Sequence, residues 1–150
     1  MFRTIALAAT AVGLLTGAAQ AADFEVKALN FDEGKMMVME PSLLRIAPGD
    51  TVHFIVKDKG HNFETVPGML PDGATPIAGK LNQDLTVKFD KPGVYGLRCH
   101  PHYTMGMVAM VVVGKPVNGA AAKAAPQLGQ AKKVFAGLFT KLDAQQTAAK

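Results

Sequence analysis

The sequence of 150 residues contains a single cysteine, Cys99. A lone cysteine cannot form an internal disulfide, so its thiol is expected to be either reactive or occupied, and metal ligation would occupy it. The chain has no run of basic residues, and its aromatic residues do not interleave with lysine and arginine, which argues against nucleic-acid binding. Beyond the N-terminal region, no segment is long and apolar enough to cross a membrane. The lone thiol is therefore the first group that needs a function.

Residues 1–21 have the pattern of a secretory signal peptide. A positive start at Arg3 precedes the apolar run 5–15, and the small residues at 19–21 form a cleavage site. We expect cleavage after Ala21 and export, which in a bacterium means the periplasm. A membrane anchor is the alternative, but the run is short and no stop-transfer pattern follows it. Cleavage lowers the formal net charge from +4 to about +3, a mildly basic balance that suits an acidic docking partner.

Residues 22–150 are enough for one domain with its own core. Apolar and polar residues alternate over 24–29 with the period of a half-buried strand. Proline and glycine mark turns, for example at 48–50 and 91–93. Short strands divided by such turns predict an all-β fold, a β-sandwich. The expected strands are 24–29, 36–39, 43–46, 51–56, 81–89, 94–98 and 107–113, and the segment 57–69 is expected to be a loop.

The composition changes towards the C-terminus. Residues 118–125 are rich in alanine, Pro126 interrupts them, and 127–149 favours helix again, with apolar residues at helical spacing. We expect two short helices within about 118–149 that fold back on the sandwich. A membrane-active or partner-binding helix is the alternative, but the apolar stripe has ordinary width and a sandwich face is available to bury it.

Chemistry-bearing residues concentrate in the loop 99–107, Cys-His-Pro-His-Tyr-Thr-Met-Gly-Met. Cys99, His102 and Met107 supply a thiolate, an imidazole and a thioether, three of the four ligands of an electron-transfer copper site. The second histidine must come from elsewhere, and His61, between a glycine and an asparagine, is the candidate. Sulfur ligands favour Cu(I) and imidazoles suit both oxidation states. The sequence therefore predicts one copper ion per chain that cycles between Cu(I) and Cu(II).

Three other functions would use the same residues. Copper storage or delivery, the main alternative, usually relies on clustered methionine or cysteine, whereas the methionines here are scattered. A hydrolase with Cys99 as nucleophile and His102 or His100 as base lacks a convincing third member and a substrate cleft. A structural zinc site would leave Met107 without a purpose. Because a catalytic metal needs an open position or a second metal, we predict that the protein is not an enzyme.

The motifs at 60–62, 99–103 and 105–107 resemble those of the cupredoxins, and closely those of the pseudoazurins. The resemblance covers essentially the whole chain after residue 21, including the two C-terminal helical segments. It implies a Greek-key sandwich of eight strands with one type 1 copper ion at one end. The metal ligands carried over to this sequence are His61, Cys99, His102 and Met107.

The same resemblance implies single-electron transfer between redox proteins of the periplasm. Implied partners are copper nitrite reductase, in denitrification, and c-type cytochromes, which dock transiently. Transfer partners need brief, small contacts, so we expect a monomer.

Several residues near the predicted site carry further expectations. His100 departs from the family pattern, in which a small residue is expected, and is interpreted as a surface histidine that titrates near neutrality. Asn62 is expected to hydrogen-bond across to the cysteine loop, and His53 to be a structural or surface histidine rather than a ligand. Met37 is expected to lie against His102. An apolar patch at the exposed edge of His102 is expected from Pro101 and Met105, framed by basic residues that steer acidic partners, namely Lys57, Lys59, Lys80 and Arg98.

Overall fold

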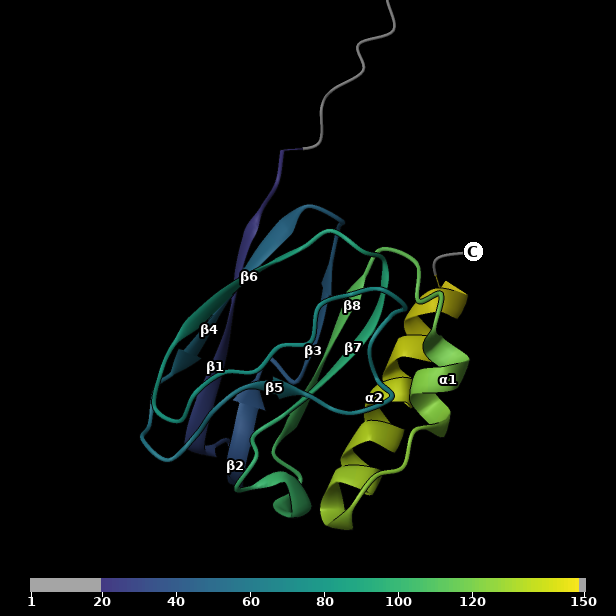
Figure 1. Ribbon diagram of the computed structural model, residues 1–150. Helices are drawn as coiled ribbons and strands as arrows, with labels where there is room; N and C mark the ends of the chain where they lie inside the picture. The colour runs from purple at the N-terminus through teal and green to yellow at the C-terminus, as the bar shows by residue number, and fades with distance from the viewer. Residues whose placement is uncertain (1–19, 149–150) are drawn as a thin grey trace, which may run out of the picture.

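The computed structural model describes residues 20–148, so almost all of the expected signal peptide lies outside the described residues. Within this range the chain forms eight strands, two α-helices and one 3-10 turn. Figure 1 shows two sheets packed face to face, with both helices against the outer side of one of them. The predicted sandwich with two C-terminal helices is confirmed.

Each sheet contains four strands. The first has the order β2 (Lys35–Glu40), β1 (Asp23–Asp32), β4 (Asp50–Val56) and β6 (Leu85–Phe89). The second has the order β3 (Leu43–Ile46), β8 (Val108–Val113), β7 (Gly93–Arg98) and β5 (Glu64–Thr65). The pairs β1–β4 and β3–β8 are parallel, and the other pairs are antiparallel.

Besides β1, which extends beyond the predicted 24–29 to Asp32, two predicted segments differ from the structure. The expected strand 81–89 begins only at Leu85, because the preceding side chains bond to backbone instead. Asn82 Oδ1 accepts from the Gly60 N–H at 2.6 Å, and Asp84 Oδ1 accepts from the Val56 N–H at 2.7 Å. The second difference is β5, a strand of two residues inside the expected loop, which is too short to show alternation in the sequence.

The helices bury the outer face of the second sheet. The helix α1 (Gly119–Ala124) is short as predicted, whereas α2 (Gly129–Ala148) has 20 residues and fills most of the predicted segment 127–149, so it is not a short helix. All of β8 is buried: alternate residues face the sandwich interior or pack under Phe135 and Leu138 of α2. Each fully buried side chain of this size contributes about 1.5–3 kcal/mol, so the helical tail is part of the fold. No helix within 20–148 has the length and apolar character to cross a membrane.

The fold brings two distant loops to the same end of the sandwich. One is the connection 57–63 that follows β4, and the other is the loop 99–107 between β7 and β8. The backbone N–H of His100 donates to Asn62 Oδ1 at 2.7 Å and joins the two loops directly. This loop pair holds the residues that the sequence analysis singled out.

Candidate metal centre

Three potential metal ligands converge between the two loops. Cys99 Sγ lies 3.6 Å from His61 Nδ1 and 3.5 Å from His102 Nδ1, and the two Nδ1 atoms are 3.1 Å apart. In a triangle with these edges, the point equidistant from the three atoms lies about 2.0 Å from each, the length of a metal–imidazole bond. The three donors are therefore placed to hold one metal ion.

Short-range backbone hydrogen bonds shape the loop that carries Cys99. The Cys99 N–H donates to the Met107 carbonyl at 3.0 Å, and the Met107 N–H donates to the His102 carbonyl at 3.2 Å. The chain turns back through the 3-10 turn Tyr103–Met105 and through Gly106, whose φ of 92° favours glycine. These contacts return Met107 to the base of the loop, where it is fully buried.

A hydrogen bond from outside both loops orients His61. Its Nε2 lies 2.9 Å from Asn30 Oδ1 of β1. An amide oxygen only accepts, so Nε2 carries the proton and the Nδ1 lone pair faces Cys99. Burial lowers the pKa of His61, as does the neighbouring His102, while Asp58 opposes the shift. The resulting neutral imidazole is the form that binds metal ions. Asn30 was missed by the sequence analysis, because nothing local links a strand asparagine to a distant histidine.

The Cys99 thiol is also fully buried. Burial raises the pKa of Cys99, while hydrogen bonds from the backbone N–H groups of Asn62 and His102 oppose the increase, and the charge of Glu64 adds to it. A thiol in such a place keeps its proton until a metal ion displaces it. The two backbone donors would then remain to stabilise the thiolate.

Asn62 links the loops as predicted. Its Oδ1 accepts from the His100 N–H at 2.7 Å, while its Nδ2 donates to the Gly79 carbonyl at 3.1 Å. Only 6% of the residue is exposed to solvent, so both bonds are protected from water. The position of the Cys99 loop relative to His61 is therefore fixed by a buried amide.

Glu64 of β5 forms a second link that the sequence analysis did not find. Its Oε1 accepts from Arg98 Nε at 2.7 Å and from His100 Nδ1 at 2.9 Å. Burial raises the pKa of Glu64, but the hydrogen bonds and charges of His100 and Arg98 outweigh burial and leave the pKa lowered. Arg98 is thus ion-paired, and its guanidinium also lies 5.0 Å from the Tyr103 ring centre. Of the basic residues that were expected to attract acidic partners, Arg98 is therefore already engaged within the protein.

The remaining expectations concern histidines and the surface patch. His53 lies apart from the centre and contacts Thr86 Oγ1 at 3.0 Å and Asp23 at 3.4 Å, which confirms a structural histidine. The His100 side chain is 71% exposed, as expected for a surface residue. His102 is half-buried, and its neighbours Pro101 and Met105 are exposed, so an apolar patch does surround this ligand.

Comparisons with known proteins agree with this geometry. The model of the copper-binding plastocyanin/azurin family matches residues 25–114. Pseudoazurin of Methylorubrum extorquens is 48% identical over 145 residues, which cover 95% of this chain and 98% of that protein. Pseudoazurin of Paracoccus pantotrophus is 43% identical over 130 residues, 85% of this chain and 90% of that protein. The crystal structure of pseudoazurin from Methylobacterium extorquens has a TM-score of 0.77 at 49% identity and covers 80% of this chain and 98% of its own.

A β-sandwich that joins two histidines and a cysteine at one end, and that matches this copper-binding family, is a cupredoxin with copper as its cofactor. Plastocyanins and azurins, which give this family its name, are copper-binding electron carriers. Within that class, the chain belongs to the pseudoazurin family. Single-electron transfer at a copper site, the function predicted from the sequence, is confirmed at this level.

Proposed function

We propose that the protein carries single electrons in the bacterial periplasm, after removal of residues 1–21, and donates them to copper nitrite reductase in denitrification. Its metal ligands are His61, Cys99, His102 and Met107. The observation that carries this proposal is the convergence of His61, Cys99 and His102 on one point. When bound there, copper supplies a one-electron change between Cu(I) and Cu(II).

Met107 would complete the ligand set with its thioether sulfur. It is fully buried, and its backbone is hydrogen-bonded to both Cys99 and His102. A long axial methionine contact is the usual fourth ligand of such a site. Because hydrogen bonds already hold these side chains and their backbone, little of the protein moves when the charge of the site changes, and transfer is fast.

Electrons pass through the exposed edge of His102. The other three ligands are buried, whereas His102 is half-buried and lies beside the exposed Pro101 and Met105. A small apolar patch suits brief docking of a partner. Exposed lysines steer acidic partner surfaces towards it, with a c-type cytochrome as the second kind of partner and the protein acting as a monomer. The lysines are Lys57, Lys59 and Lys80.

The first experiment records visible and EPR spectra of the chain from residue 22 after addition of Cu(II), before and after a mild reductant. An intense blue band with narrow copper hyperfine splitting, bleached reversibly, is expected from a Cys99 thiolate bond. A pale Cu(II) spectrum would contradict the proposed ligands and would make copper storage or delivery the better account.

A second experiment tests the partner. The reduced protein is mixed with copper nitrite reductase, and the return of the blue band is followed after addition of nitrite. Rapid reoxidation is expected only when both reductase and nitrite are present. Met105→Lys, which places a charge in the apolar patch, should slow reoxidation without changing the spectrum of the site. Equal reoxidation rates for Met105→Lys and the parent protein would argue against docking at His102.

A further inference from the structure

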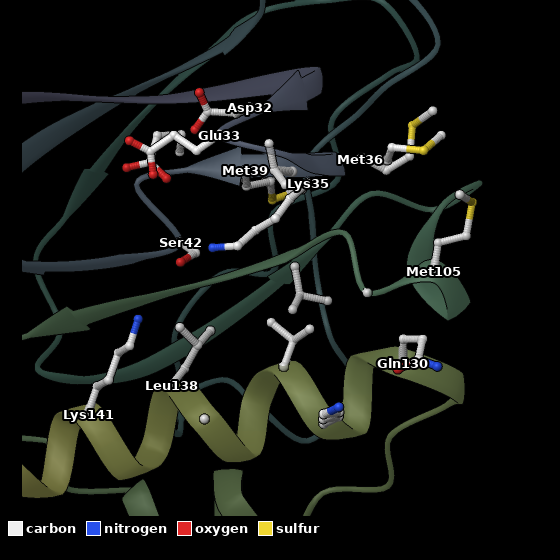
Figure 2. A pocket seen from close by; sticks show the side chains of 18 residues that line it. Asp32, Glu33, Lys35, Met36, Met39, Ser42, Met105, Gln130, Leu138 and Lys141 are labelled. Carbon is white, nitrogen blue, oxygen red and sulfur yellow. The ribbon is translucent and has the colours of Figure 1, made fainter.

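A groove of about 450 Å³ runs between β2 and α2 and reaches Met105 and Gly106 of the loop 99–107. The side chains of β2 form one wall, α2 forms the other, and Met105 and Gly106 of the 3-10 turn close one end. Figure 2 shows Met36 and Met105 at that end of the groove, on different elements but near one another in the view. Met36 is not one of the four candidate copper ligands, and Met105 contributes to the apolar patch beside His102.

The methionines at this end differ from the others that the structure describes. Met36 is 64% exposed and Met105 is 49% exposed. Within 20–148 the others are buried, apart from Met37, which is half-buried and also lines the groove. The buried ones are Met39, Met69, Met107 and Met110.

The backbone of β2 explains how two consecutive methionines reach the groove. Met37 has a φ of 52°, a left-handed conformation that is uncommon for a residue other than glycine. In a regular strand, Met36 and Met37 would point to opposite faces of the sheet. Met36 and Met37 both line the groove, and Met37 also packs against the core between the sheets. Three thioethers, from two elements, therefore line the same groove.

Thioether sulfur is a soft, uncharged ligand that selects Cu(I) over harder cations. We propose that Met36, Met37 and Met105 form a second copper site, which takes up monovalent copper at the surface and passes it to the buried site. The transfer needs no oxidant or reductant, because the ion stays Cu(I) throughout. Bonds to three thioethers are exchanged for bonds to the buried ligands, and the Cys99 thiol releases its proton to water.

The position of Met105 favours such a transfer. Met105 lies between the ligands His102 and Met107 in the chain, and its N–H donates to the His102 carbonyl at 3.1 Å. His102 is also the only one of the four ligands that is not buried. An ion held at Met105 is thus beside the one ligand through which the buried site can be reached from solvent.

The competing explanation is that the exposed methionines serve only as apolar docking surface. A copper site requires the thioether sulfur atoms, whereas an apolar docking surface does not. Leucine preserves the apolar area and most of the shape of methionine, and such volume-conserving exchanges are tolerated. Replacement of Met36 and Met105 by leucine therefore removes the proposed copper site while it keeps the apolar surface.

Binding is tested by NMR on protein labelled at the methionine methyl groups, with the main site already filled with Cu(I). A cuprous acetonitrile complex is titrated anaerobically. The methyl signals of Met36, Met37 and Met105 are expected to shift together and to saturate at one added equivalent, while that of the buried Met110 stays unchanged. The proposal is overturned if these three signals do not move, or if the Met37 signal still shifts in the same way in the Met36→Leu/Met105→Leu variant.

Transfer is tested by loading the metal-free protein from a Cu(I)–bicinchoninate complex and counting filled sites by their blue band after oxidation. We expect the double leucine variant to load several-fold more slowly than the parent, with the same final intensity. Met110→Leu, which removes a sulfur from the core, is the matched control and should load at the parent rate. Equal rates for the double variant and the parent would overturn the transfer step.

Discussion

The two histidines of the centre occupy opposite environments. His61 is fully buried and is fixed on its far side by Asn30, a residue of β1. His102 is half-buried in a short loop, and within 20–148 the structure describes no protein partner for its Nε2. The first histidine is held by the fold as a whole, and the second by its own loop.

This difference separates two requirements of an electron carrier. A rigid site limits the motion that accompanies a change of charge, and His61 meets that need through burial and a fixed tautomer. A partner must also come close to the metal, and His102 meets that need because one edge reaches solvent. Because of this asymmetry, we expect that imidazole from solution can replace the side chain of His102 but not that of His61.

The largest effect is expected from His61→Gly and His102→Gly, which each remove one imidazole. Both variants should lose the blue band completely. Added imidazole should restore the band in His102→Gly, because the vacated position opens to solvent, but not in His61→Gly, whose position is enclosed. Titration with imidazole, followed by visible spectroscopy, measures the difference.

N-Methylimidazole provides the control, since it has a single nitrogen able to bind metal and restores the same band only by direct ligation. Equal rescue of both variants would show that His61 is as accessible as His102 and would remove the basis of the comparison.

Asn30→Ala should weaken copper binding through the buried ligand His61 and leave His102 unaffected. It leaves His61 in place but removes the oxygen that fixes its tautomer. Loss of such an outer partner typically lowers metal affinity 10- to 100-fold, and because Asn30 is exposed and water can replace part of the bond, we expect about 10-fold. Competition with a copper chelator measures the affinity. His53→Ala, on the outer face of the sheet, is the control, and equal losses in both variants would contradict a specific effect of Asn30.

Glu64→Gln should weaken the link between β5 and the Cys99 loop by a similar amount. The glutamine side chain retains an acceptor but loses the charge, so we expect unfolding free energy at neutral pH to fall by about 1.5 kcal/mol, the lower end for hydrogen bonds to charged groups. The Glu64 side chain is 21% exposed, which favours that lower end. Urea unfolding of the metal-free protein measures the change.

The lowered pKa of Glu64 predicts how its contribution to stability changes with pH. Because the folded state lowers the pKa of Glu64, its stabilisation is present above the ordinary pKa of about 4.3. The stabilisation is lost as pH falls through the lower value of the folded state. The parent protein should therefore lose more stability on acidification than Glu64→Gln, and parallel pH profiles would contradict this prediction.

The sequence was informative where the site is local. Cys99, His102 and Met107 lie within one loop, and their spacing follows from a tight turn that the chain itself encodes. Asn30 and Glu64 were not found, because each acts through tertiary contacts: Asn30 across from β1, and Glu64 from a two-residue strand that pairs with β7. Asn62 was found only because it adjoins a ligand.

The smallest expected effect concerns the cysteine loop alone. Backbone N–H groups of Asn62 and His102 hydrogen-bond to the Cys99 sulfur, and Pro101 between Cys99 and His102 has no N–H to add. Pro101→Ala supplies one more donor, which draws electron density from the thiolate and stabilises the reduced site. One hydrogen bond of about 1 kcal/mol corresponds to a rise of about 40 mV in a one-electron potential. Voltammetry measures it, and an unchanged or lower potential would refute the argument.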